Sequence, residues 1–343
     1  MAHQSLYRVY RPQSFKEVIG QDQVVNPLTE QIQSGKVAHA YLFSGSRGLG
    51  KTSIARIFAR ELKTDERDIV ELDAASNNKV ENVRELNESV FTLPFNSARK
   101  VYILDEVHML STGAWNAFLK TLEEPPAHVI FILATTELEK VPETVRSRCQ
   151  VFTFKKPSRQ GLSELVLSVA KKEGYTVEPA AADLIALLGD GSYRDALSVL
   201  EKALASSSDK KLTREETEKA TGAPRHALVH ELAAALSVSD TGKALSTVRA
   251  ASEQGIDMQL YLSLVLEYVR QILLLRHAPD LRKEVSQELG EDAAKEALLL
   301  AEAKDSRLTH DTLKLLLEAA ARMRFSPLPE LPLELAILEH ASV

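Results

Sequence analysis

The amino-acid sequence predicts an α/β domain with a parallel sheet, followed by a small helical domain and a larger all-α domain. Short apolar runs alternate with helical stretches up to about residue 155, which is typical of a parallel sheet covered by helices. The strand-like runs stop after Pro157, and every later periodic segment has helical spacing. Because 343 residues exceed the usual size of one domain, we expect three, at residues 1–157, 158–221 and 222–343.

Five segments have the composition expected of strands buried on both faces, because they are nearly continuously apolar and rich in β-branched and aromatic residues. In chain order they are residues 39–45, 68–74, 100–106, 129–136 and 150–155. Helices are expected between them, for example at residues 51–63 and at residues 112–124, where Pro125 and Pro126 end the helix.

The C-terminal half predicts helices and no further strands. Residues 158–221 predict a small helical bundle, interrupted by a polar loop at residues 205–213. From Pro224 onward apolar side chains recur at helical spacing, as at Leu260, Leu264, Tyr268 and Ile272.

Composition narrows the location and chemistry of the protein. With 44% apolar and 26% charged residues it resembles an ordinary soluble protein. No apolar run approaches the about 18 residues that cross a bilayer, and the N-terminal segment has no apolar signal core, so we expect a cytoplasmic protein without a membrane partner. The single cysteine, Cys149, excludes an internal disulfide and a multi-cysteine zinc site. We interpret it as a packing residue and expect no zinc.

The net charge of −6 lies mostly in the C-terminal third. Residues 222–343 hold 13 Lys and Arg against 18 Asp and Glu, which leaves 29 against 30 for the remainder. Any contact with nucleic-acid phosphates should therefore come from the first two thirds of the chain.

The segment GSRGLGKTS, residues 45–53, fits the phosphate-loop pattern G-x-x-x-x-G-K-[ST] and lies between a predicted strand and a predicted helix. Its glycines let the backbone wrap so that N–H groups face phosphate oxygens, and the helix N-terminus adds partial positive charge. Lys51 is expected to reach the β- and γ-phosphates, and Thr52 to offer its hydroxyl to Mg²⁺. The predicted nucleotide-binding residues of this loop are Gly45, Ser46, Arg47, Gly48, Leu49, Gly50, Lys51, Thr52 and Ser53.

Two carboxylates end the strand predicted at residues 100–106. Asp105 is placed to hold Mg²⁺ directly or through water, and Glu106 to orient and polarise the attacking water. An acidic pair at a strand end is often only a solvated turn, but the phosphate loop earlier in the chain favours the catalytic interpretation. We interpret the neighbouring His108 as a packed or surface residue rather than a ligand.

Two other places carry candidate site residues. Thr135 or Thr136, at the end of the next strand, can hydrogen-bond the γ-phosphate or the attacking water, although threonines in strands usually just pack. Arg194 lies near the start of a predicted helix, where the helix dipole disfavours a cation, and a bound triphosphate would explain it. The alternative is a surface ion pair with Asp190 or Asp195.

Eight segments carry a more specific signal: YRPQSFKEVIGQ, HAYLFSGSRGLGKTS, ELDAASNN, LDEVHML, KTLEEPP, FILATTE, RSRC and RDALSVL. Together they resemble the gamma/tau family of clamp-loader subunits of bacterial DNA polymerase III, which are AAA+ ATPases. The resemblance is dense from Tyr7 to about Leu200 and looser beyond. It implies that the three expected domains are an AAA+ P-loop ATPase domain, a helical lid and a helical collar for oligomerisation. On this resemblance we expect the sequence to end after the collar, as in the short form of that family.

The resemblance also implies a function. Such subunits bind ATP with Mg²⁺ and hydrolyse ATP to open a sliding clamp and load it onto primer–template DNA. The implied partners are delta- and delta-prime-type subunits, copies of the same subunit in a five-subunit assembly, the clamp and the DNA. Arg148 would act in trans as an arginine finger, Thr136 (or Thr135) would sense the γ-phosphate, and Arg194 would couple it to the lid. The residues implied to lie over adenine and ribose are Tyr7, Arg11, Pro12 and Val18.

One feature of the sequence departs from the family pattern. Family members commonly insert a four-cysteine zinc module after the phosphate-loop helix, whereas only KTDERD joins that helix to the next strand here.

Residues 74–86, with Lys79 and Arg84, can contact DNA phosphates at a helix start, but a plain solvated helix is the alternative.

The sequence leaves two other functions open. One is a non-hydrolysing, stator-like clamp-loader subunit, a class that tends to lose the phosphate-loop lysine or the acidic pair. The other is a different AAA+ DNA-remodelling ATPase, such as a branch-migration helicase, which would need a basic C-terminal wing.

Overall fold

The computed structural model describes residues 4–207, 209–289 and 291–342. The chain divides into two compact units. The first runs to Leu162 and includes Ala186–Ser198, and the second comprises Ser163–Ile185 and the chain from Val199. The finer division into three domains, at 157/158 and 221/222, stays a prediction.

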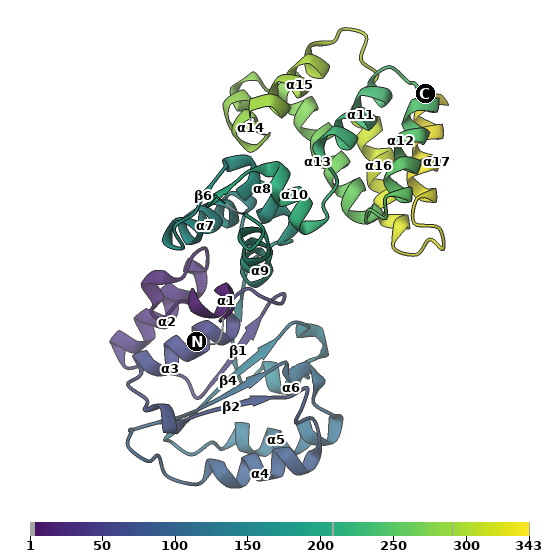
Figure 1. Ribbon diagram of the computed structural model, residues 1–343. Helices are drawn as coiled ribbons and strands as arrows, with labels where there is room; N and C mark the ends of the chain where they lie inside the picture. Colours follow the sequence, from purple (N-terminus) through teal and green to yellow (C-terminus); the bar gives the residue numbers. More distant parts are fainter. Residues whose placement is uncertain (1–3, 208, 290, 343) are drawn as a thin grey trace. The chain divides into compact units, whose positions relative to one another are not determined.

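The first unit is built on a parallel sheet of five strands in the order β2-β3-β4-β1-β5 (Figure 1). The strands are β1 (Ala40–Ser44), β2 (Ile69–Asp73), β3 (Lys100–Asp105), β4 (Val129–Thr135) and β5 (Gln150–Thr153). All five predicted strands are confirmed. Burial on both faces, however, holds only for the three central strands, because β2 and β5 are edge strands and stay partly exposed.

Alternate side chains of the central strands feed two hydrophobic cores, one on each face of the sheet. Tyr41 and Phe43 of β1 pack with α2 (Asp22–Ser34) and α3 (Lys51–Glu61). Leu42 packs on the other face with α4 (Val80–Val90) and α5 (Thr112–Glu123). The carboxyl ends of the parallel strands therefore meet at one edge of the sheet, where Ser44 of β1 lies beside Thr135 of β4.

Short elements complete the first unit. They are α1 (Leu6–Val9), η1 (Phe15–Glu17), η2 (Glu66–Asp68), η3 (Val107–Met109), η4 (Leu138–Lys140) and α6 (Glu143–Arg146). The connection from α3 to β2 contains only η2, where the buried carboxylate of Asp68 accepts backbone N–H groups of Phe95, Asn96 and Ser97 at 2.6 to 3.0 Å. The expectation that the protein binds no zinc stays a prediction.

The described part of the predicted lid region, residues 158–207 and 209–221, contains four helices and two very short strands. They are α7 (Arg159–Lys172), β6 (Thr176–Val177), α8 (Pro179–Leu188), α9 (Tyr193–Leu204), β7 (Lys211–Leu212) and α10 (Arg214–Thr221). The expectation of no strands after Pro157 is wrong, since β6 and β7 pair in parallel. Two paired residues are too few to leave an alternating pattern in the sequence.

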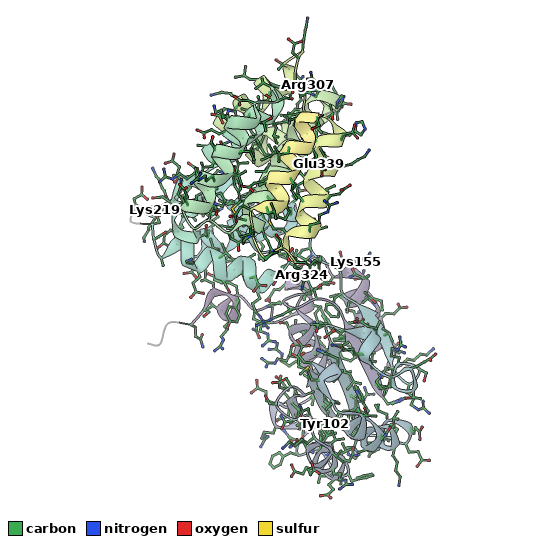
Figure 2. The ribbon with its side chains drawn as sticks, turned by 90° about the vertical axis from the view of Figure 1, so that its right-hand side faces the viewer. Tyr102, Lys155, Lys219, Arg307, Arg324 and Glu339 are labelled. Atoms are coloured by element: carbon green, nitrogen blue, oxygen red, sulfur yellow. The ribbon has the colours of Figure 1, made fainter. Side chains whose placement is uncertain are left out.

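In residues 222–289 and 291–342, the regular structure of the C-terminal region is helical. Its helices are α11 (His226–Ser237), α12 (Thr241–Glu253), α13 (Met258–His277), η5 (Pro279–Leu281), α14 (Arg282–Leu289), α15 (Glu291–Glu302), α16 (His310–Met323) and α17 (Leu331–Ser342). The predicted apolar stripe lies on α13, which packs against α11, α15 and α16. Charged side chains such as Arg307 and Glu339 project outward from this bundle (Figure 2).

Helix α13 corrects one expectation. It has 20 residues, and an 18-residue window of it has a mean hydropathy of 1.3, so it is long and apolar enough to cross a membrane by length and composition alone. Just over half of that window, 56%, is buried inside the protein, as in the central helix of a bundle. The sequence pattern therefore underestimated the apolar length of this helix.

Candidate functional site

The phosphate loop connects β1 to α3. Gly50 precedes the helix with φ +92°, and Gly48 has φ +77°. A Cβ atom on Gly48 would lie 2.0 Å from Oγ of Ser192, so both backbone conformation and space require glycine there. Leu49 is buried against the sheet, whereas Ser46 and Arg47 are exposed.

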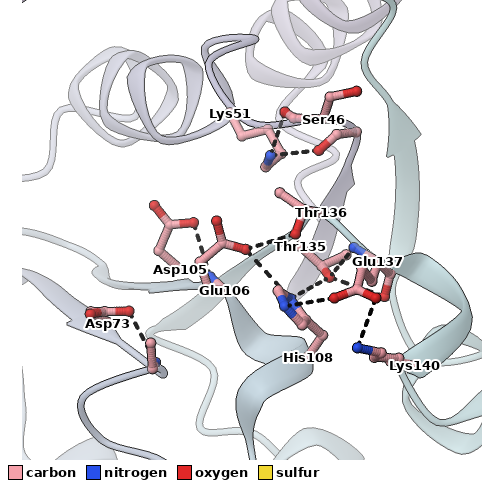
Figure 3. A network of polar contacts seen from close by, with 12 residues as sticks. Ser46, Lys51, Asp73, Asp105, Glu106, His108, Thr135, Thr136, Glu137 and Lys140 are labelled. Carbon is pink, nitrogen blue, oxygen red and sulfur yellow. Dashed lines mark hydrogen bonds and ion pairs between the residues drawn. The ribbon is translucent and has the colours of Figure 1, made fainter. Parts of the chain in front are cut away.

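Lys51 is fixed beneath the loop. Its Nζ donates hydrogen bonds to the backbone carbonyl oxygens of Gly45 at 2.6 Å and Ser46 at 2.9 Å (Figure 3). Its side chain is buried. Burial lowers the pKa of Lys51, while the carboxylates of Glu106 and Asp105 act in the opposite direction. The phosphate loop and the ammonium group of Lys51 therefore hold each other in position through these two hydrogen bonds.

Thr52 and Asp105 meet at the ends of α3 and β3. Oγ1 of Thr52 donates a 2.6 Å hydrogen bond to Oδ2 of Asp105, and Oδ1 accepts the N–H of Glu106 at 3.0 Å. A hydroxyl and a carboxylate are oxygen donors of the kind that Mg²⁺ prefers, and Mg²⁺ needs few protein ligands. Within the described ranges, no group of three or more His, Cys, Asp or Glu side chains could hold a metal ion.

Glu106 contacts the end of β4. Its Oε2 accepts a hydrogen bond from Oγ1 of Thr136 at 3.2 Å, and Nδ1 of His108 lies 3.4 Å away (Figure 3). Thr135 is fully buried and its hydroxyl bonds to the backbone of Glu137. Of the two threonines that the sequence left open, Thr136 is therefore the one that contacts the carboxylate.

The N-terminal segment lies next to α3, and its four candidate residues are partly buried: Tyr7, Arg11, Pro12 and Val18. Nε of Arg11 donates to Oγ of Ser53 at 2.8 Å. Burial, with the nearby charge of Arg56, lowers the pKa of Arg11. A cavity of about 460 Å³ opens beside this contact, lined by Arg11, Gln13, Ser53, Arg56, Arg60, Glu66, Ile69 and Glu71. The structure thus brings Arg11 to the phosphate loop.

The start of α9 contacts the phosphate loop, a relationship that the sequence did not predict. The N–H of Tyr193 donates to the carbonyl of Gly48 at 3.2 Å, and its hydroxyl donates to the carbonyl of Ile19 at 2.6 Å. The guanidinium of Arg194 lies 5.8 Å from the centre of the Tyr7 ring. In the sequence, the only sign of this contact is the position of SYRD at a predicted helix start.

Arg194 makes neither of the ion pairs that were its alternative explanation. In the part of the chain that the structure describes, Asp190 pairs with Lys156 at 3.6 Å, and Arg194 pairs with neither Asp190 nor Asp195. An exposed, unpaired arginine beside the loop is compatible with a role toward a nucleotide.

Arg148 lies apart from the phosphate loop and is held by its own neighbours. It donates to Oε1 of Glu123 and to the carbonyl of Thr144, both at 2.6 Å. Nearby, Nε of Arg146 is buried without a hydrogen-bond partner among the described residues. Cys149 packs against the sheet core, and burial raises the pKa of its thiol to about 12, as expected for a packing residue.

Three family models match consecutive parts of the chain. One described as DNA polymerase III, delta subunit, matches residues 20–78 and 63–158. A model of the ATPase lid domain of DNA polymerase III clamp loader subunits matches residues 163–209. A model of domain III of DNA polymerase III subunits gamma and tau matches residues 212–343.

Curated relatives extend this likeness over the whole chain. DNA polymerase III subunit gamma of Buchnera aphidicola subsp. Schizaphis graminum is 34% identical over 360 residues, which cover 99% of this chain and 98% of that protein. The chain belongs to the gamma/tau family of DNA polymerase III subunits. Subunit tau of Bacillus subtilis, another gamma/tau protein, is 37% identical, and the match covers 99% of this chain but only 63% of that protein.

The gamma/tau chain also shares its fold with solved AAA+ structures. The RuvB Holliday junction branch migration motor of Thermotoga maritima aligns with a TM-score of 0.54 and 21% identity, over 85% of this chain and 91% of that one. A likeness at this identity concerns the fold alone. It confirms the AAA+ parallel-sheet P-loop architecture with helical regions after it.

Proposed function

We propose that this gamma/tau chain is an ATP-hydrolysing subunit of the replicative clamp loader. It uses ATP binding and hydrolysis to open a sliding clamp and load it onto primer–template DNA, as part of the DNA polymerase III holoenzyme in the cytoplasm. The observation that carries this proposal is the hydrogen bond between Thr52 and Asp105 beside the buried Lys51. It joins the loop that cradles phosphates to the strand that ends in two carboxylates.

The binding step uses the loop and its lysine. N–H groups of residues 45–53 and the start of α3 face the phosphates, and the ammonium of Lys51 balances the β- and γ-phosphate charge. Thr52 and Asp105 would hold Mg²⁺, which when bound neutralises charge on the phosphate oxygens. Arg11 and Arg194 add positive charge beside the loop, next to Tyr7, where adenine and ribose would lie.

The chemical step uses Glu106. Its carboxylate accepts a hydrogen bond from the attacking water and orients that water toward the γ-phosphate. Thr136, which bonds to Glu106, is placed to report the presence of the γ-phosphate through the same contact. Arg194 would transmit that state to the lid.

Arg148 would complete the site of a neighbouring subunit. Since its guanidinium is paired with Glu123 within its own chain, reaching a neighbour requires exchange of that exposed ion pair, which costs at most about 1 kcal/mol. The partners are delta- and delta-prime-type subunits and copies of this chain in a five-subunit ring segment. The start of α4, with exposed Lys79 and Arg84, is a candidate contact to DNA phosphates.

Two variants in the assembled complex test the proposal. Lys51→Ala should abolish ATP binding, because no other group replaces the ammonium beneath the loop. Glu106→Gln should bind ATP with the parent affinity but hydrolyse it about 10²-fold or more slowly. Equilibrium binding and steady-state hydrolysis, with clamp and primer–template DNA present, measure both. Hydrolysis by Glu106→Gln at the parent rate would show that the proposed mechanism is wrong.

A further inference from the structure

His108 lies between two carboxylates of the candidate site (Figure 3). Its Nδ1 is 3.4 Å from Oε2 of Glu106, and its Nε2 is 3.2 Å from Oε1 of Glu137. The side chain is only 8% exposed, so water competes little for either nitrogen. The reaction proposed above gives this imidazole no role.

The two oxygens of the Glu106 carboxylate have different surroundings. Oε2 accepts a hydrogen bond from Thr136 and faces His108. Among the residues described, Oε1 has no hydrogen-bond partner. A carboxylate anchored through one oxygen presents the other in a fixed direction, and orientation of this kind is what a general base requires.

The backbone at Glu106 supports this arrangement. Glu106 has φ +50° and ψ +44°, a left-handed conformation that costs an L residue about 1–2 kcal/mol. The turn lets η3 begin directly after β3, and the N–H of Met109 bonds back to the carbonyl of Glu106 at 2.9 Å. This turn brings the imidazole of His108 back beside the carboxylate of Glu106, two residues earlier in the chain. Strain of this kind persists where surrounding contacts fix it, often at functional sites.

The other nitrogen of His108 is fixed from the segment that follows β4. Glu137, which faces Nε2, also pairs with Nζ of Lys140 at 2.8 Å. Its backbone N–H donates to Oγ1 of Thr135 at 3.0 Å, and that hydroxyl lies 3.2 Å from Nδ1. Because the imidazole ring is rigid, holding Nε2 also sets the direction of Nδ1.

We propose that His108 is a positioning residue for the water-activating carboxylate. With Thr136 it holds Oε2 of Glu106, so that Oε1 faces the attacking water, and Glu137 holds the imidazole in place. This inference rests on the proposed hydrolysis of ATP. A neutral imidazole has one N–H and can serve only one of its neighbours, where Oγ1 of Thr135 at 3.2 Å and Oε2 of Glu106 at 3.4 Å both face Nδ1. An imidazolium can donate at both nitrogens, and so toward both carboxylates. The groups that face the ring are Glu106, Thr135 and Glu137, with Lys140 behind Glu137.

Two amide substitutions separate the two nitrogens. An Asn amide reaches roughly the position of Nδ1 and a Gln amide roughly that of Nε2. His108→Asn therefore keeps a donor toward Glu106, and His108→Gln keeps one toward Glu137. In the assembled complex we expect His108→Gln and His108→Leu to lower kcat about tenfold, with His108→Asn losing less. Affinity for a non-hydrolysable ATP analogue should change less than about twofold, because the residue acts on the water and not on the nucleotide.

A pH profile distinguishes positioning from a purely structural role. An amide does not titrate, so His108→Asn should change the shape of the kcat–pH curve, whereas a loss of folding would scale the whole curve. Glu137→Gln gives a second route that leaves the imidazole in place, and a several-fold fall in kcat is expected. His310→Asn is the matched control, since that histidine is 76% exposed and lies in the other unit.

The outcomes separate this inference from the proposed function. If the parent complex does not hydrolyse ATP, or if Glu106→Gln matches it, the proposed function fails. If Glu106→Gln is inactive but every His108 variant keeps the parent rate and pH profile, only the role of His108 is wrong. Equal or higher activity of His108→Gln relative to His108→Asn would limit His108 to supporting Glu137 and would overturn the inference.

Discussion

The hydroxyl of Thr52 donates a 2.6 Å hydrogen bond to Oδ2 of Asp105 and so joins the first turn of α3 to the end of β3. In the sequence these residues are separated by η2, β2 and α4. The contact brings a hydroxyl oxygen and a carboxylate oxygen close enough for a single cation to bind both. Dependence on Mg²⁺ is therefore the first property to test.

Replacing Thr52 by Val should weaken binding of ATP in the presence of Mg²⁺ about tenfold, because the oxygen is lost while the shape is kept. Binding of nucleotide with EDTA present should change little. Titration of a fluorescent ATP analogue with and without Mg²⁺ measures both. Thr52→Ser is the matched control and should retain Mg²⁺ dependence. An equal loss with and without Mg²⁺ would assign Thr52 to the phosphate instead.

Replacing Arg148 by Ala should leave ATP binding by the mutated chain unchanged and lower hydrolysis at the adjacent site. The expected fall is at least about 10³-fold if it acts as other arginine fingers do. Complexes assembled from mixtures of Arg148→Ala and Lys51→Ala chains report the effect on a neighbour. Glu123→Gln, which removes the partner of Arg148 within its own chain, should not lower hydrolysis. A binding defect confined to the mutated chain would contradict a role in trans.

Replacing Gly48 by Ala should destabilise the protein more than the same change at Gly35. Both glycines have positive φ, +77° and +70°, so both substitutions carry the backbone cost of about 1–2 kcal/mol. Only Gly48 adds a clash, with Ser192, whereas nothing lies within 4 Å of a Cβ atom on Gly35. Overpacking of this kind costs about 1–3 kcal/mol more. Urea unfolding of the two variants measures the difference, and equal losses would contradict the packing of the loop against Ser192.

The mostly buried imidazole of His226 predicts that stability falls in mild acid. Burial, aided by the charges of Arg214 and His230, lowers the pKa of His226 from 6.5 to about 4. Between these values the unfolded chain binds a proton that the folded chain does not, so the folded state is favoured above about pH 6.5. That advantage is lost as the pH falls toward 4, and its full size is about 3 kcal/mol.

Urea midpoints at pH 7.5 and pH 5 test this dependence. His226→Gln should reduce the loss of stability between the two conditions, since an amide does not titrate. His310→Gln, at an exposed position, should behave as the parent. Two other groups face His226. Oε2 of Glu296 lies 3.3 Å from its Nε2, and the centre of the Tyr268 ring lies 5.0 Å from the centre of its imidazole ring. An unchanged pH dependence in His226→Gln would assign the acid sensitivity to those or other groups.

Much of the first unit could be predicted because its signals are local. Continuous apolar runs identified the strands, and the glycine pattern identified the loop between β1 and α3. Exposure of β2 and β5 could not be read from the same runs, because edge position depends on strand order and not on composition. The two-residue strands β6 and β7 are likewise too short to show a period.

The site was predicted best where neighbouring residues in the sequence act together. Asp105 and Glu106 were found from their place at a strand end, but the choice of Thr136 over Thr135 depends on which side chain turns toward Glu106. The sequence indicates only a packed or surface residue at His108, because its partner Glu137 lies after β4, far away in the chain. Contacts between residues from separate segments of the chain produce no recognisable residue spacing in the sequence.

The contact of α9 with the phosphate loop means that the start of this helix and the loop move together. Ser192 and Tyr193 touch Gly48, and Tyr193 is also tied to Ile19 at the start of the segment before α2. Because both contacts are direct, the start of the helix cannot rotate without displacing the loop that is proposed to receive the triphosphate. A shift of the loop would therefore displace the start of α9, and a shift of the start of α9 would displace the loop.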